Sequence, residues 1–160
     1  MAEQLTKLKL VLQGLGVDND ISTRDSRIKL QKLICLTQIT GLKLGYGFSW
    51  YVRGPYSPSL TSDYYALANS PEEGVGLPEG LVLTEESTRK LETVRNLAQV
   101  PNVDLDEVGW LELLASVAFL RKSSRLSEES ARTKISESKP TLAQFYDLAT
   151  QKLKDAALVE

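Results

Sequence analysis

The sequence contains no histidine and only one cysteine among its 160 residues. The absence of histidine excludes serine–histidine and cysteine–histidine catalysis and the usual zinc site with imidazole ligands. With Cys35 alone, no disulfide can form within the chain, which favours a reducing compartment. The chain also lacks the spaced aspartates that are typical of a calcium loop. We therefore expect neither a bound metal ion nor a cofactor.

Long hydrophobic runs are missing as well. No apolar segment approaches the roughly 18 residues that a membrane-spanning helix requires, and the first residues are too polar for a signal peptide. These features predict a cytoplasmic protein without membrane contact. The hydrophobic share of 42% and the charged share of 25% are ordinary for a globular protein, and the length predicts a single domain over residues 1–160.

The formal net charge is only −2, so the chain lacks the large basic excess of proteins that coat nucleic acid. Charge is nevertheless distributed unevenly. Six basic residues and one acidic residue lie between Arg24 and Arg53, whereas ten acidic and three basic residues lie between Glu72 and Glu112. A surface with a basic part and an acidic part favours oriented contact with a partner or between copies of the chain.

Apolar residues recur at helical spacing over most of the chain and predict about seven helices. The segment from Arg27 to about Ile39 is apolar around more than half of its circumference, so it should form a central helix. Strands are expected only at residues 48–52 and, as a short candidate, at residues 81–84. We expect a mainly α (α+β) fold, a compact single-domain helical bundle with a small β-hairpin or wing.

The segment FSWYVRGPYSPSL, residues 48–60, concentrates aromatic and stiff residues around a Gly-Pro pair. Gly54 permits a left-handed backbone and Pro55 fixes its own φ, so we expect a rigid corner between a strand and a helix. Phe48, Trp50 and Val52 lie on the inner face of the expected strand, and Phe48 and Trp50 should be buried as part of this corner.

The other strand face and the corner carry tyrosine and arginine, which are enriched at interface hot spots. Two lysines one turn apart on the preceding helix extend this set. The predicted partner-contact surface consists of Lys29, Lys32, Tyr51, Arg53, Tyr56 and Ser57. The alternative interpretation is a solvated edge without a partner.

The sequences RIKLQKLICLTQ and LGYGFSWYVRGPYSPSL resemble the Panacea antitoxin-domain family, which includes SocA-like proteins and YwgA-like uncharacterised relatives. The shared signature is a Lys-Leu-Gln-Lys-Leu helix, an aromatic strand, and Gly-Pro followed by a helix. The resemblance covers residues 24–68, with Gln31 and Lys32 in the helix signature and residues 53–57 at the corner. It implies a compact helical domain that acts through protein contact, as a toxin-neutralising protein or an adaptor, with no catalytic residue.

Three functional hypotheses follow. The first is a non-enzymatic protein-binding module, an antitoxin or phage-defence adaptor whose partner is a toxin or a client delivered to a protease. The second is a winged-helix-like nucleic-acid-binding regulator that uses the basic segment. The third and weakest is an enzyme, because its candidate acids are explained as first-turn helix residues that favour the helix dipole. These acids are Glu85, Glu86, Asp104, Asp106 and Glu107.

Overall fold

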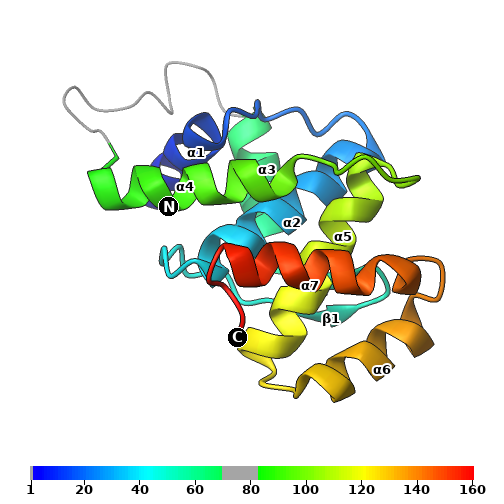
Figure 1. Ribbon diagram of the computed structural model, residues 1–160. Helices are drawn as coiled ribbons and strands as arrows, with labels where there is room; N and C mark the ends of the chain where they lie inside the picture. The colour runs from blue at the N-terminus through cyan, green and yellow to red at the C-terminus, as the bar shows by residue number, and fades with distance from the viewer. Residues whose placement is uncertain (1, 70–82) are drawn as a thin grey trace.

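The computed structural model describes residues 2–69 and 83–160. Within these ranges it contains seven α-helices and one antiparallel two-stranded hairpin, which confirms the expected mainly α fold class (Figure 1). The helices are α1 (Ala2–Leu15), α2 (Arg24–Ile39), α3 (Pro58–Asn69), α4 (Glu85–Ala98), α5 (Glu107–Ala118), α6 (Glu128–Ser138) and α7 (Tyr146–Asp155). The strands are β1 (Ser49–Tyr51) and β2 (Gly54–Tyr56). A π-helical turn, η2 (Phe119–Ser123), continues α5, and a 3-10 turn, η3 (Ala143–Phe145), precedes α7.

Helix α5 lies at the centre of the fold. Ten of its twelve residues are buried, and it contacts α2, α4, α6, α7 and strand β2. Figure 1 shows α1 and α4 on one side of α5 and α6 on the other. Trp110 of α5 is fully buried, and its indole N–H donates to the carbonyl oxygen of Leu97 at 2.8 Å, which ties α5 to the end of α4. Helix α2, whose residues 30–37 are buried, makes the most extensive helix–helix contact of the fold with α5.

The buried hydrophobic residues of the described ranges, apart from Val108 and Phe119, form one continuous cluster to which every α-helix contributes. Burial of this apolar surface is the main term that stabilises the fold. Cys35 belongs to this core, at 2% exposure, and burial raises the pKa of its thiol to about 12. A thiol with so high a pKa is a packing residue and not a nucleophile.

The hairpin differs from the sequence prediction in its second strand. The residues expected to form only a corner, Gly54–Tyr56, pair with β1, so that Trp50 lies opposite Pro55. Proline is tolerated there because both strands of a two-stranded hairpin are edge strands. Val52 lies in the turn and is 91% exposed, although alternation placed it on the inner face. The candidate strand at 81–84 is absent at residues 83–84, and its first two residues lie outside the described ranges.

Short side chains start the helices that surround the hairpin. Thr23 and Ser26 form a reciprocal capping pair at the start of α2, and the Asp106 carboxylate accepts the N–H of Gly109 at 2.7 Å at the start of α5. Pro58 begins α3 directly after the hairpin, at the helix position where a missing N–H costs nothing. The starts of α2 and α5 and the hairpin turn line one cavity, so these caps fix the frame around the turn.

Candidate functional site

The side chain of Gln31 on α2 holds the end of the hairpin. Its amide nitrogen donates to the carbonyl oxygen of Ser57 at 3.0 Å, and its amide oxygen accepts the N–H of Ser57 at 2.9 Å. Both residues are buried. A buried backbone group needs a hydrogen-bond partner, and the Gln31 amide pairs with both the N–H and the carbonyl group of Ser57. This part of the Lys-Leu-Gln-Lys-Leu signature therefore has a structural role, which is to join α2 to the start of α3.

Lys32 lies underneath the hairpin. It is 2% exposed, and its Nζ donates to the carbonyl oxygen of Pro55 at 2.8 Å. Burial lowers the pKa of its ammonium group to about 8. Ser57 is fully buried as well. The prediction that Lys32 and Ser57 lie on an outer contact surface is therefore wrong, because the hairpin folds over both side chains.

A buried ionic cluster clamps the hairpin turn to α5. Glu112 accepts a hydrogen bond from Arg53 Nε at 2.8 Å through Oε1 and from Lys139 Nζ at 3.0 Å through Oε2. Lys139 also donates to the carbonyl oxygen of Val52 at 3.1 Å. The side chains of Glu112 and Lys139 are only 9% and 3% exposed, whereas that of Arg53 is 43% exposed. The cluster therefore has a buried carboxylate–ammonium pair inside and a guanidinium at its rim.

The sequence prediction missed Glu112 and Lys139. The signal for Glu112 is present, since it is a single acid inside the apolar run WLELLASVAFL. An acid is rarely buried unless it is paired, so its position indicates a buried cation nearby. Nothing local marks Lys139, which lies 87 positions after Val52 in the chain.

Gly54 lets the hairpin approach α5 closely. Its φ is +90°, a conformation that L side chains rarely adopt, and a Cβ at this position would collide with Ser116 Oγ. The Ser116 hydroxyl is buried and has no hydrogen-bond partner among the described residues. Gly54 and Pro55 are buried, in agreement with their expected place in a rigid corner. Two physical constraints therefore require glycine at position 54, namely its backbone conformation and the lack of room for a side chain.

The aromatic residues of the corner are only half-buried. Phe48 and Trp50 pack against the edge of the core cluster. The Trp50 ring stacks with Phe119 of the π-helical turn at a centroid distance of 6.3 Å, and Lys139 Nζ lies 5.4 Å from its centre. A cation at this distance is attracted by the aromatic face. Trp50 therefore covers the buried lysine and links the hairpin to η2.

The outer side of the hairpin carries the remaining predicted contact residues. We define the hairpin tip as Tyr51, Val52 and Arg53. Tyr51 is 48% exposed and meets the ring of Tyr56 edge-on at 5.2 Å. The hydroxyl group of Tyr56 is hydrogen-bonded to that of Thr61 at 2.6 Å. Tyr51, Arg53 and Tyr56 therefore lie on one small structure that is anchored from below.

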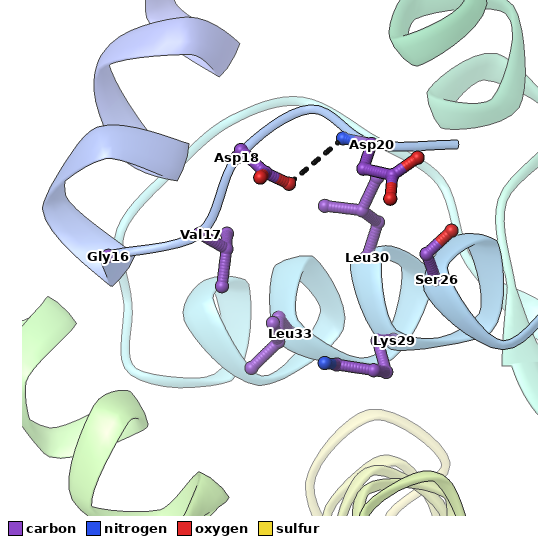
Figure 2. Close-up of a pocket in the computed structure, with 8 residues that line it drawn as sticks. All are labelled: Gly16, Val17, Asp18, Asp20, Ser26, Lys29, Leu30 and Leu33. Carbon is purple, nitrogen blue, oxygen red and sulfur yellow. Dashed lines mark hydrogen bonds between the residues drawn. The ribbon is translucent and has the colours of Figure 1, made fainter. Parts of the chain in front are cut away.

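Lys29 lies apart from this structure. Its ammonium pairs with Glu107 at the start of α5, and it lines a cavity of about 280 Å³ beside the end of α1. Figure 2 shows its amine on the far side of that cavity from the carboxylates of Asp18 and Asp20. Asp18 accepts the N–H of Asp20 at 3.2 Å, and Asp20 accepts that of Ser22 at 2.9 Å. The pKa of Asp20 is lowered first by hydrogen bonding with the Ser22 side chain and then by this backbone hydrogen bond. Both acids stabilise a turn, and Lys29 and Lys32 do not form one contact face.

Three of the acids considered for catalysis lie at the starts of helices. Glu85 and Glu86 occupy the first turn of α4, and Asp106 caps α5. In residues 2–69 and 83–160, no three potential ligands among His, Cys, Asp and Glu come together as a metal site. No helix in the same ranges is long and apolar enough to cross a membrane.

Comparison of the chain with protein-family models, curated proteins and solved structures finds no match. Function is therefore inferred from the hairpin, from the groups that hold it and from the cavities beside it.

Proposed function

We propose that the chain is a non-enzymatic protein-binding module, an antitoxin or defence-associated adaptor that works in the cytoplasm by direct contact. Its partner is a toxin or a client protein that is delivered to a protease. The local resemblance of residues 24–68 to the Panacea family supports this class of function. The observation that carries the proposal is that the hairpin tip exposes the side chains of Tyr51 and Val52 on a backbone that is held from inside. Lys32 donates to the carbonyl oxygen of Pro55, and Lys139 donates to that of Val52.

The physical advantage of this arrangement is its rigidity. A flexible loop loses conformational entropy when it binds, whereas a loop that is already ordered keeps most of its interaction energy for affinity. Tyrosine supplies a large contact area with few rotatable bonds, and arginine adds a charge at the rim. An apolar side chain as exposed as Val52 gains burial only when another molecule covers it.

The experiment is co-purification of the tagged chain with the products of its neighbouring genes. We compare the wild type with Val52→Lys at the tip and with the matched variant Val100→Lys, since Val100 is also exposed but lies beyond the end of α4. Both variants should keep the wild-type melting temperature. The partner should be retained by wild type and Val100→Lys and be at least about tenfold depleted with Val52→Lys.

The proposal is contradicted if Val52→Lys retains the partner as well as the wild type does. It is also contradicted if no partner protein co-purifies with the wild type. Arg53→Glu is a poorer probe, because it would place a second carboxylate against Glu112 and so change stability together with binding.

The alternative is a winged-helix-like nucleic-acid-binding regulator. It is favoured by Arg24, Arg27 and Arg53, which line one cavity beside the hairpin. Such a protein should bind duplex DNA at low salt and lose affinity steeply as the salt concentration rises. Absence of binding at low salt excludes it.

A further inference from the structure

A cavity of about 280 Å³ opens between the first half of α2, helix α3 and the hairpin. Its lining contains four cations and no acid. The cations are Arg24, Arg27, Lys32 and Arg53. Its lining also contains three aromatic residues, which are Tyr56, Tyr64 and Tyr65. The cavity therefore combines concentrated positive charge with aromatic rings. Of these residues, only Arg53 belongs to the hairpin tip, so the proposed protein contact does not explain the others.

The arginines of the cavity have hydrogen-bond donors left over. The Arg24 side chain makes no hydrogen bond or ion pair with any residue that the structure describes. Arg27 uses one donor, Nη1, on the carbonyl oxygen of Ile21 at 2.8 Å, and Arg53 uses Nε on Glu112. A guanidinium carries five N–H donors in a planar fork that fits phosphate oxygens in pairs. One unused fork and two partly used forks around one cavity form a receptor for a phosphate group.

Lys32 adds a charge that the protein leaves incompletely compensated. Its Nζ has one hydrogen bond, to Pro55, and no carboxylate of the described residues pairs with it. Glu112 raises its pKa from a distance, but burial outweighs that effect, and the charges of Lys139 and Arg53 act in the same direction as burial. Burying a charge without a counter-charge is costly. An anion in the cavity would supply the counter-charge.

The positive ends of two helices add to this potential. Arg24 is the first residue of α2, and Thr61 lies in the first turn of α3 on the cavity wall. The helix macrodipole favours an anion at such ends.

The tyrosines supply flat apolar surface. Tyr65 is 40% exposed, and its ring lies 5.3 Å from that of the buried Tyr64. Tyr56 and Tyr64 are both hydrogen-bonded to the hydroxyl of Thr61. Because Tyr64 is buried, the accessible rings are those of Tyr56 and Tyr65. Aromatic side chains of this kind stack on nucleobases, which all present a π-face. A site that held only inorganic phosphate would have no use for them.

We propose that this cavity binds a nucleoside monophosphate, with Arg24 and Arg27 on the phosphate, Lys32 below it and the base against Tyr65. The volume of about 280 Å³ lies just below the usual range of ligand pockets, which favours a single mononucleotide over a larger ligand. The site goes beyond the protein contact proposed above. Because Arg53 belongs to both the cavity and the hairpin tip, the nucleotide changes the charge that the tip presents to a partner.

The test is isothermal titration at low salt and pH 7 with AMP, GMP, CMP and UMP, and with adenosine and inorganic phosphate as separate arms. At least one nucleotide should bind with a Kd below about 1 mM, and adenosine and phosphate should each bind at least about tenfold more weakly. Arg24→Gln with Arg27→Gln should weaken the nucleotide at least about tenfold. The matched double variant Arg89→Gln with Lys152→Gln removes the same charge from exposed positions on α4 and α7 and should bind as the wild type does.

A second variant guards against a folding defect, since Arg27 also holds a backbone carbonyl. Tyr65→Ala alters an exposed ring and should weaken nucleotide binding without lowering the melting temperature. The proposal is overturned if no nucleotide binds at 10 mM (roughly tenfold above the expected Kd), or if the arginine variant binds as well as the charge control. It is also overturned if phosphate alone binds as tightly as the nucleotides. Binding of an oligonucleotide that mononucleotides do not compete away would instead favour a nucleic-acid surface. None of these results depends on whether a protein partner exists.

Discussion

Replacement of Glu112 by glutamine tests the buried ionic cluster. The two side chains have the same shape, so the variant removes the charge without leaving a cavity. Removing one partner of a buried pair costs about 3–5 kcal/mol, because the other charge stays buried without compensation. The Lys139 side chain, at 3% exposure, carries nearly all of this cost, since the half-exposed Arg53 can be solvated and contributes at most about 1 kcal/mol. We expect the free energy of unfolding to fall by about 3–4 kcal/mol.

Urea denaturation followed by circular dichroism at pH 7 measures this loss. Glu107→Gln is the matched control, since Glu107 pairs with Lys29 at a half-exposed position, and it should cost less than about 1 kcal/mol. Adding Lys139→Met to Glu112→Gln removes the stranded ammonium and should recover more than half of the loss. The reasoning is refuted if Glu112→Gln costs no more than the control, or if the double variant is no more stable than Glu112→Gln alone. Either result would mean that water already solvates the cluster.

Two further predictions concern the contacts of the hairpin with α2 and α5. Gly54→Ala should lower the free energy of unfolding by about 2–3 kcal/mol, as measured by thermal and urea unfolding. Adding Ser116→Ala should recover the part of this loss that comes from the steric clash and leave about 1–2 kcal/mol for the left-handed backbone. Equal stability of the single and double variants would contradict the predicted clash. Lys32 binds fewer protons in the folded state, where its pKa is about 8, than in the unfolded state, where it is 10.5, so stability should rise with pH through this window. The free energy of unfolding should rise by about 1 kcal/mol between pH 7 and pH 9; at higher pH, loss of the Cys35 proton from the unfolded chain opposes this rise. Lys32→Met should abolish the rise. If the rise persists in this variant, another group causes it.

The fold class was predictable because it depends on local signals. Helical spacing of apolar residues marks each helix whatever its neighbours are, and Gly54 announces a special backbone by its residue type. The second strand was missed because a Gly-Pro pair usually marks the end of a strand. Proline is acceptable in β2 because the sheet of the described ranges has only two strands, so that β2 is an edge strand.

The errors at the site have a different physical origin. Lysine and serine are surface types on average, so the sequence placed Lys32 and Ser57 outside. Their burial depends on the packing of the hairpin against α2, through contacts such as Lys32 with Pro55, 23 positions apart, which no local pattern encodes. Tyr51 and Arg53 were placed on the outer side because alternation along a short strand needs no distant partner.

The long separation between Val52 and Lys139 has a consequence for synthesis of the protein. A ribosome that adds about 5–20 residues per second makes the hairpin roughly 4–17 seconds before the lysine that holds its turn. During this interval the aromatic segment lacks the hydrogen bond from Lys139 and its full packing against α5. It is then an isolated two-stranded hairpin, which is marginally stable and accessible to nascent-chain chaperones. The tip acquires its fixed shape only after translation has passed position 139, so recognition through it is a property of the completed fold and not of the emerging chain.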